Sequence, residues 1–205
     1  TDIPATVDGD TVSFSAASNF NGSETFTATV TDGELSSSQV FTVTINAVND
    51  APTANTATGT VLEDGSIVIT LTGDDVDGDN LSFSLDTDTT NGSVSIEGAL
   101  ATFMPAANYN GDDSFIFIAS DGELSSTATV VLTVEAVNDA PVLDSVSNVT
   151  FNEDNSISID LPGSDVDGDD LEYIVSGGSN ITATVDGNTV SFSAASNFNG
   201  SENFI

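Results

Sequence analysis

Residues 74–79 read Asp-Asp-Val-Asp-Gly-Asp, and residues 164–169 repeat this stretch as Ser-Asp-Val-Asp-Gly-Asp. Alternate residues of an extended chain project to one side, and the glycine lets the chain bend, so each stretch can direct three carboxylates into one small volume. The carboxylates belong to Asp75, Asp77 and Asp79, and to Asp165, Asp167 and Asp169. Crowded carboxylates repel unless a cation offsets their charge, and Ca²⁺ suits such an oxygen-rich cluster. An acidic, solvated turn is the alternative interpretation.

The acidic stretch belongs to a repeat of 89 or 90 residues. Val-Asn-Asp-Ala-Pro stands at residues 48–52 and again at 137–141, while Asn-(Phe/Tyr)-Asn-Gly stands at 19–22, 108–111 and 197–200. A fixed period of this size predicts a tandem array. We therefore expect the C-terminal half of one repeat in residues 1–48, a complete repeat in 49–137, and the N-terminal two-thirds of a third in 138–205.

The first and third repeats resemble each other more closely than either resembles the middle one. Residues 3–26 and 181–204 differ at only three positions, whereas the middle repeat diverges widely over the same phase. The longer protein is therefore expected to repeat in pairs of unlike units. Because the chain opens with Thr1 rather than Met, we expect it to be a segment of a longer polypeptide.

Apolar and polar residues alternate in short runs throughout the chain, which predicts β-strands. The runs of the middle repeat lie near 60–63, 66–72, 81–85, 93–96, 100–104, 114–119 and 127–136. Seven short strands separated by Gly, Asn and Asp within about 90 residues predict an all-β fold, a two-sheet Greek-key sandwich. The expected core residues are Val68, Leu71, Leu81, Phe83, Val94, Phe103, Phe115, Phe117, Val130 and Leu132.

The composition excludes several kinds of chemistry. The 205 residues include 33 Asp and Glu but no Lys, Arg, His or Cys, for a net charge of −33. Histidine bases, His-ligated zinc, disulfides, thiol nucleophiles and Schiff bases are therefore impossible. The charge also repels nucleic acids and anionic membrane surfaces, and no apolar run approaches the ~20 residues of a membrane helix.

The order of these motifs resembles a known family. An Asn-Asp-Ala-Pro linker, then Glu63, the acidic stretch and Asp121-Gly122 follow one another before the next linker, as in cadherin repeats. The chain is most similar to the bacterial cadherin-like and Ig-like tandem repeats, including the "tandem-95" type, of giant secreted adhesins. The resemblance covers the whole chain and implies sandwiches stacked end to end.

The resemblance also implies Ca²⁺ sites where repeats meet. At the first junction the implied ligands are Asn49, Asp50, Asp75, Asp77 and Asp121; at the second they are Glu63, Asn138, Asp139, Asp165 and Asp167. Two departures imply fewer ions than in cadherins, one or two per junction. The linker lacks an Asn that cadherins have, and Ala-Ala-Asn-Tyr at 106–109 replaces their acidic middle motif. An EF-hand is excluded because Gly78 falls fourth, not sixth, from Asp75.

Three classes of function remain open to comparison. The first is a structural extender, a stalk or fibre shaft of an extracellular, secreted or cell-surface bacterial protein, stiffened by Ca²⁺ and serving cell adhesion. The second is a module that recognises a carbohydrate or other copies of the protein. The third is an enzyme with paired carboxylates, such as a glycosidase. Because the acidic residues recur at every joint while an active site is normally unique, we expect an extender and no enzyme, with neighbouring repeats as partners and other copies in a fibre as further ones.

Overall fold

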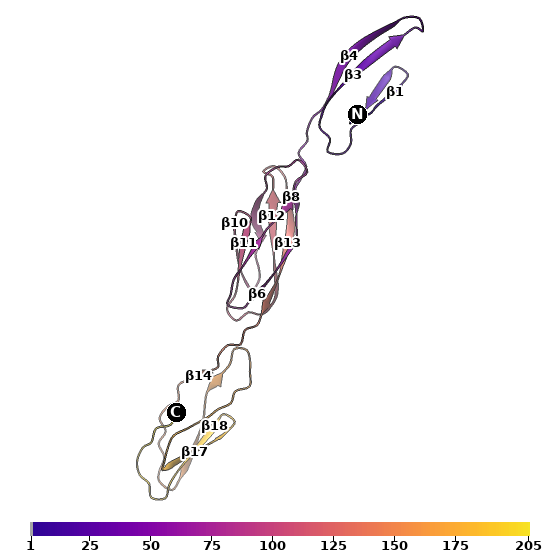
Figure 1. Ribbon diagram of the computed structural model, residues 1–205. Coiled ribbons are helices and arrows are strands. Elements are labelled where there is room, and N and C mark those ends of the chain that lie inside the picture. The colour runs from indigo at the N-terminus through magenta and orange to yellow at the C-terminus, as the bar shows by residue number, and fades with distance from the viewer. Residues whose placement is uncertain (1) are drawn as a thin grey trace. The chain divides into compact units, whose positions relative to one another are not determined.

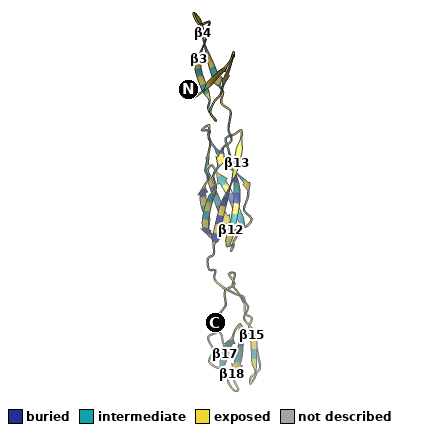
Figure 2. Cartoon of the chain, turned by 90° about the vertical axis from the view of Figure 1, so that its right-hand side faces the viewer, coloured by how far each residue is buried: buried dark blue, intermediate teal, exposed yellow. Residues whose placement is uncertain are grey.

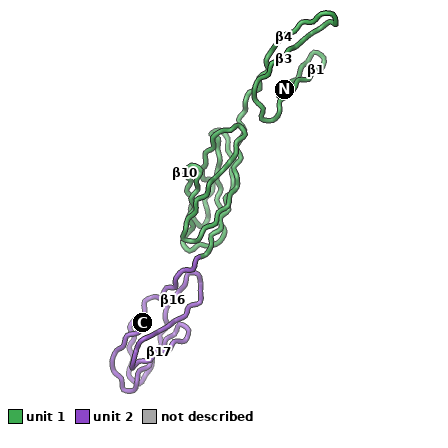
Figure 3. The backbone as a smooth tube through the Cα atoms, in the orientation of Figure 1, with its two compact units in different colours: residues 1–136 green, residues 137–205 purple. Residues whose placement is uncertain are grey.

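The computed structural model describes residues 2–205, which form two compact units divided at Ala136 and Val137 (Figure 3). Regular structure within the described residues consists of strands, without a helix (Figure 1). The prediction of an all-β fold is therefore confirmed.

The middle segment of the chain forms a sandwich of two sheets. Its main strands are β6 (Ala57–Leu62), β7 (Ile67–Thr70), β9 (Ser82–Thr87), β10 (Gly92–Glu97), β11 (Leu100–Pro105), β12 (Gly111–Ser120) and β13 (Ser125–Glu135). One sheet has the order β10-β11-β7 and the other the order β6-β13-β12-β9. Strands β5 (Thr53–Ala54) and β8 (Gly73–Asp74) pair with each other in a separate, short two-stranded sheet. The seven expected strands are all present, with ends shifted by a few residues.

Both sheets contribute to one apolar core. Phe103 from one sheet and Phe115, Phe117, Val130 and Leu132 from the other are each at most 1% exposed. Buried residues are concentrated in these strands (Figure 2). Burying side chains of this size is the main favourable contribution to folding. The core expected at these positions is confirmed.

Val68 is a correction to the expected core. Its side chain is 58% exposed, whereas Ile69 is 7% exposed and Ile67 packs against the core. Ile67, Val68 and Ile69 are all apolar, so alternation of residue type does not indicate which of them point inward. Pairing decides the matter: Ile67 and Ile69 lie opposite Phe103 and Ala101 of β11, which are both fully buried. Val68 therefore faces out.

One pairing in the middle segment is parallel. Strand β6 runs in the same direction as β13, with Ala57 opposite Val130 and Leu62 opposite Glu135, while β12 pairs with β13 and β9 in antiparallel register. The first strand of the sandwich is thus hydrogen-bonded to the last. This pairing joins the two ends of the middle segment within one sheet.

Residues 2–48 form two hairpins. Strand β1 (Ala5–Asp8) pairs with β2 (Thr11–Phe14), and β3 (Gly22–Thr31) pairs with β4 (Ser36–Ile45). Phe14, Phe26 and Phe41 form an aromatic cluster with ring centroids 5.0 to 6.0 Å apart. The positive φ of Gly33, +95°, turns the chain between β3 and β4, as the Asp-Gly pair predicts.

The second unit repeats part of the middle sandwich. Strands β15 (Ser156–Asp160), β18 (Thr189–Ala194) and β17 (Ile181–Asp186) form a sheet in that order, and β14 (Val142–Leu143) pairs with β16 (Gly163–Ser164). The register matches the middle segment, because Ile157 lies opposite Phe192 as Ile67 lies opposite Phe103. The internal repeat of the sequence is therefore a repeat of strand pairing.

Candidate metal centre

The first acidic loop is folded around the carboxylate of Asp75. Its Oδ1 accepts hydrogen bonds from the backbone N–H groups of Asp77, Gly78 and Asp79, at 2.9, 3.1 and 3.3 Å. Gly78 has a φ of +83°, which lets the chain wrap around this oxygen. The stretch is thus a side-chain-capped turn rather than the extended segment from which the sequence argument started.

The second acidic loop repeats this arrangement and brings its carboxylates together. Oδ1 of Asp165 accepts the N–H groups of Asp167 and Asp169 at 2.9 and 3.4 Å, and Gly168 has a φ of +80°. One carboxylate oxygen from each of Asp165, Asp167 and Asp169 lies within 4.8 Å of the others. Among residues 2–205 no other set of three acidic side chains has its carboxylate oxygens within this distance. The carboxylates of Asp75, Asp77 and Asp79 therefore lie farther apart.

Each linker is hydrogen-bonded to the acidic loop that follows it. The N–H of Asp50 donates to Oδ2 of Asp77 at 2.8 Å, and the N–H of Asp139 donates to Oδ2 of Asp167 at 2.6 Å. Both linkers thus place an aspartate backbone beside the middle carboxylate of the loop, although 27 or 28 residues separate the partners.

Asn49 and Asn138 differ in their contacts. The Asn49 side-chain amide donates to Oδ2 of Asp121 at 2.9 Å, across 72 residues of sequence. The Asn138 amide instead donates to the carbonyl oxygen of its neighbour Asp139 at 2.9 Å. The first linker therefore contacts two loops of the middle sandwich: Asp50 binds the loop that holds Asp75 and Asp77, and Asn49 binds the turn that holds Asp121.

Asp121 is held in its ionised form by hydrogen bonds. Its Oδ1 accepts the backbone N–H groups of Leu124 and Glu123, both at 2.7 Å. These two bonds, followed by the bond from Asn49, lower the pKa of the Asp121 carboxyl below its usual value. Asp32 forms the same turn with Leu35 and Glu34, so this geometry belongs to the repeat. Asp121 offers a charged oxygen to a cation at neutral pH.

One oxygen of the first loop has no donor. Oδ2 of Asp75 is buried from solvent and accepts no hydrogen bond, although Oδ1 of the same carboxylate accepts three. A buried, unsatisfied carboxylate oxygen is costly unless a positive group compensates it. The chain contains no Lys, Arg or His to do so. A hard divalent cation fits this oxygen, because it needs oxygen ligands that carry charge.

Glu63 lies at the end of the middle sandwich where β6 finishes. It follows β6, its side chain is 3% exposed, and its N–H donates to the carbonyl oxygen of Glu135 at 2.9 Å. A shared site with Asn138, Asp139, Asp165 and Asp167 stays a prediction.

Asp64 beside Glu63 was not among the predicted ligands. It adopts a φ of +60°, and its Oδ1 accepts the N–H of Asn108 at 3.4 Å. Asn108 belongs to the Ala-Ala-Asn-Tyr stretch at 106–109. Asp64 thus adds a carboxylate beside this stretch. Its recurrence as Asp154, with a φ of +62°, is the signal that could have identified it.

Sequence reasoning also missed a second class of carboxylate. Asp113 accepts the N–H groups of Thr90 and Asn91 at 3.2 and 2.7 Å. Glu202, at the matching position, accepts those of Ser179, Asn180 and Ile181 at 2.8 to 3.1 Å. The bonds from Ile181 and then Ser179 lower the pKa of Glu202 to about 2. These acids fasten a loop to a strand. An acid that recurs two residues after the Asn-Gly pairs at 21–22, 110–111 and 199–200 could have indicated them.

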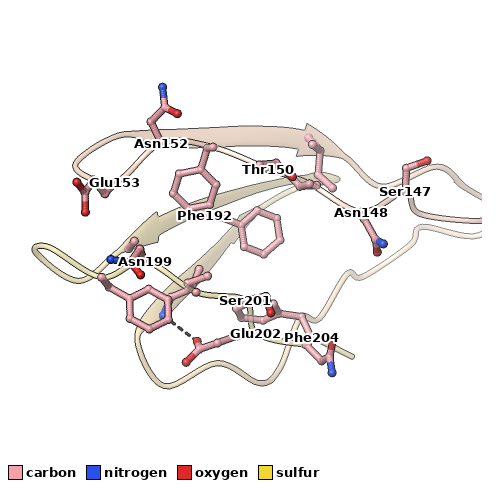
Figure 4. A pocket seen from close by; sticks show the side chains of 18 of the residues that line it. Ser147, Asn148, Thr150, Asn152, Glu153, Phe192, Asn199, Ser201, Glu202 and Phe204 are labelled. Carbon is pink, nitrogen blue, oxygen red and sulfur yellow. Dashed lines mark hydrogen bonds between the residues drawn. The ribbon is translucent and has the colours of Figure 1, made fainter.

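A cavity of about 600 Å³ in the second unit is not a convincing ligand site (Figure 4). Its lining includes Ile159, Phe192 and Phe204. Eighty-nine or 90 residues earlier stand Ile69, Phe103 and Phe115, which form the core of the middle sandwich. The cavity is therefore lined by residues of core type, on the side of the sheet that a second sheet covers in the middle sandwich.

Comparison with known proteins agrees with this architecture. The model of the bacterial Ig domain family matches residues 49–133 and again residues 138–205. The chain belongs to the bacterial Ig domain family. Its two matched copies are tandem Ig-like repeats, as the spacing of the motifs predicts. No helix within the described residues is long and apolar enough to span a membrane.

Two cadherin ectodomain structures share the fold of these bacterial Ig domains. PcdhgB3 EC1-4 aligns with 94% of this chain and 55% of its own, at 12% identity and a TM-score of 0.57. Drosophila N-cadherin EC1-4 aligns with 92% of this chain and 54% of its own, at 15% identity and a TM-score of 0.50. The cadherin-like sandwich is therefore confirmed as the fold.

A curated relative extends the sequence comparison. Integrin beta-like protein A of Dictyostelium discoideum is 32% identical over 175 residues, which cover 70% of this chain and 9% of that protein. The chain thus spans a small part of its relative. Bacterial Ig and cadherin-like domains are typically extracellular and non-enzymatic, and cadherin-like domains typically bind calcium.

Proposed function

We propose that this segment is part of the stalk or fibre shaft of a large extracellular bacterial protein that serves cell adhesion. In this proposal the bacterial Ig domains extend the chain, and Ca²⁺ held at the junctions stiffens it. The same carboxylates recur at each junction, which favours a structural role over an active site.

The buried Oδ2 of Asp75 is the observation that carries the proposal. It is an acceptor without a donor, in a loop that also contains Asp77 and Asp79 and lies beside Asp50. Asp121 adds an ionised carboxylate through its contact with Asn49. At the second junction Asp139, Asp165, Asp167 and Asp169 would serve in the same way, with Glu63 and Asn138 as further ligands. Bound Ca²⁺ would supply charge neutralisation and crosslink linker and loop.

The number of side-chain oxygens that the proposed ligands offer favours Ca²⁺ over Mg²⁺. Ca²⁺ accepts six to eight oxygens in a flexible arrangement, whereas Mg²⁺ demands a small octahedron and retains several waters. At the first junction the proposed ligands Asn49, Asp50, Asp75, Asp77 and Asp121 offer more side-chain oxygens than Mg²⁺ usually takes from a protein. A geometrically tolerant ion therefore fits them better.

Calorimetric titration of the chain with Ca²⁺ tests the binding step. We expect heat of binding from the parent and weaker binding by Asp75→Asn and by Asp165→Asn. Glu97→Gln is the matched control, since it removes one exposed negative charge at the end of β10, outside both acidic loops. Parent and loop variants that bind Ca²⁺ equally would contradict the assigned ligands.

Small-angle scattering tests the stiffening. A protein of several complete repeats should lose maximum dimension in saturating Ca²⁺ when Asp165→Ala and Asp167→Ala are introduced at every joint. The cores remain intact, because neither residue belongs to them. If the parent and the variant have the same maximum dimension while only the parent binds Ca²⁺, the ion binds without stiffening the shaft.

A further inference from the structure

Strand β2 of the first repeat has one open edge. Among the described residues it pairs only with β1, whereas the matching strand of the second unit, β18, pairs with β17 on one side and with β15 on the other. Val12 of β2 is 42% exposed, while Val190 at the matching position of β18 is fully buried. Strand β2 thus lacks the neighbour that covers β18.

The sequence identifies the strand that fits this edge. Strand β15 lies opposite residues 189–193, which read Thr-Val-Ser-Phe-Ser, and residues 11–15 read the same. Over the longer stretch, residues 3–26 differ from 181–204 at only three positions, none of which faces β15. Every side chain that β15 faces on β18 therefore has an identical counterpart in the first repeat.

The apolar side of the first repeat also matches the second unit. The ring centroids of Phe14 and Phe26 lie 5.0 Å apart, and those of Phe192 and Phe204 lie 5.1 Å apart, edge to face in both pairs. In the first repeat a third ring, Phe41 of β4, packs against both. The described residues of the second unit include no such strand. It has instead the cavity of about 600 Å³, whose lining includes Phe192 and Phe204 (Figure 4).

The middle sandwich shows how the two sets of strands combine. There β7 covers the edge of β11, and the sheet that contains β12 and β13 encloses the same core. By sequence, β15 is the counterpart of β7, while β3 and β4 are the counterparts of β12 and β13. Within the described residues, the second unit has the first of these parts and the first repeat has the others. A complete sandwich needs both.

We propose that the first repeat of one copy and the second unit of another copy form a mixed sandwich. Residues 138–180 of one copy pair with residues 3–48 of the next, so that β2 takes the place of β18 beside β15. Residues 181–205 are displaced, and their near-identical counterpart remakes their contacts. Strand β4 then fills the space of the cavity, which adds apolar burial. The contact is head to tail, so copies join into chains or rings.

The charge of the chain opposes this contact but does not lie within it. Copies with a net charge of −33 repel each other, and salt screens this repulsion. Strands β2 and β4 contain no charged residue. The one acid of β15, Asp160, accepts a hydrogen bond from the hydroxyl of Thr189 at 2.7 Å, and Thr11 can supply the same bond. The proposal goes beyond the calcium joints and does not depend on them.

Sedimentation analysis of the refolded chain tests the exchange. Because the second unit must open first, the chain is unfolded in denaturant and refolded at submillimolar concentration, in chelator and about 0.5 M NaCl. The test variant Val12→Asp places a charge where the mixed sandwich buries the side chain, as the second unit buries Val190. The control Thr6→Asp adds the same charge to β1, at a position whose counterpart, Thr184, is exposed.

We expect the parent and Thr6→Asp to form dimers and longer oligomers, and Val12→Asp to associate at least about tenfold more weakly. Thermal melting of Val12→Asp checks that its middle sandwich still folds. A parent that stays monomeric, or a Val12→Asp variant that associates as strongly as the parent, would overturn the proposal.

Mixing two blocked variants shows whether the contact is head to tail. Val12→Asp blocks the first repeat, and Ile159→Asp blocks β15, because Ile159 lies opposite Val190. Each variant alone should stay monomeric. Refolded together they should form a dimer and nothing larger, since Ile159→Asp still supplies its first repeat and Val12→Asp its second unit. A mixture that stays monomeric would contradict the exchange.

Disulfide trapping identifies the strands that pair. Ser158 and Ser191 lie opposite each other with their hydroxyl oxygens 2.8 Å apart, and Ser13 would replace Ser191. The chain has no cysteine, so Ser13→Cys in an isotope-labelled chain should cross-link to Ser158→Cys in an unlabelled one when both are refolded together with oxidised glutathione. Thr6→Cys, one strand farther from the edge, is the control. Equal yields for Ser13→Cys and Thr6→Cys would also overturn the proposal.

Discussion

The backbone N–H of Asp50 donates a 2.8 Å hydrogen bond to the carboxylate of Asp77, and so fixes the linker to the loop that follows it. The N–H of Asp139 makes the same bond with Asp167 at 2.6 Å. Bonds from N–H groups to a carboxylate are among the stronger ones in proteins. Each linker is thus tied through its backbone to the repeat after it, even without a metal.

Changes at Asp75 should separate its two roles. Asp75→Ala removes the acceptor of three backbone N–H groups and should lower the free energy of unfolding by about 1–3 kcal/mol, with or without Ca²⁺. Asp75→Asn keeps an oxygen for these groups and relieves the repulsion between carboxylates. It should therefore melt near the parent in chelator and lose the gain from Ca²⁺.

Calcium itself should raise the melting temperature of the parent by several degrees at millimolar concentration. Binding to the folded state alone stabilises by about 2.7 kcal/mol per site at a hundredfold excess over Kd. An equal concentration of Mg²⁺ should have a much smaller effect. Scanning calorimetry measures both, and identical melting curves in chelator and in Ca²⁺ would argue against the metal sites.

The phase of β7 predicts opposite outcomes for two neighbouring residues. Ile69→Ala empties part of the core and should cost about 2–5 kcal/mol of unfolding free energy. Val68→Ala alters an exposed side chain and should stay within about 0.5 kcal/mol of the parent. Chemical denaturation of the two variants checks this order. Equal losses would mean that the strand is turned the other way.

Acid should loosen the fastening made by Glu202. Its pKa of about 2 lies below the ordinary value of 4.5, so its contribution to stability is complete above pH 4.5 and is lost as the pH falls toward 2. Amide exchange at Ser179, Asn180 and Ile181 should therefore accelerate over that range, beyond the intrinsic pH dependence. Glu202→Gln should show fast exchange already at neutral pH. Carbon chemical shifts of the carboxyl report its pKa directly.

The contact between Asn49 and Asp121 should be visible in the titration of Asp121. Asn49→Ala removes the third-largest cause of the low pKa, while the N–H groups of Leu124 and Glu123 remain. The pKa of Asp121 should rise and still stay below its usual value. A carboxyl titration by NMR that is unchanged in Asn49→Ala would show that this bond does not form in solution.

Local patterns in the sequence were sufficient for most of the fold. The 89-residue spacing and the alternation of residue type indicate the strands, because both reflect which side chains can be buried. The prediction that Val68 belongs to the core was wrong for a physical reason. In the run Ile67-Val68-Ile69 every residue is apolar, so only pairing with β11 determines which side chains point inward. The parallel partner of β6 was also out of reach, since pairing across 73 residues leaves no local pattern.

In the candidate site, too, the sequence indicated local contacts better than contacts between distant residues. The turn around Asp75 connects residues two to four apart, so the sequence indicated that the carboxylates lie close, although it was interpreted as an extended segment. The contact of Asn49 with Asp121 spans 72 residues and followed only from the resemblance to cadherin repeats. Asp113 and Glu202 were not predicted, because the Asn-Gly stretches before them were used only as markers of the repeat. Their bonds to distant N–H groups depend on the packing of two hairpins.

The parallel pairing of β6 with β13 determines how the middle sandwich responds to a pulling force. The chain enters through β6 and leaves through β13, so tension applied to the two ends drags these strands in opposite directions along their common axis. Six residue pairs, from Ala57 with Val130 to Leu62 with Glu135, then bear the load together. Their hydrogen bonds must break collectively rather than one after another, as they would in an antiparallel hairpin opened from its ends. The sandwich is therefore built to resist extension along the direction in which the chain runs.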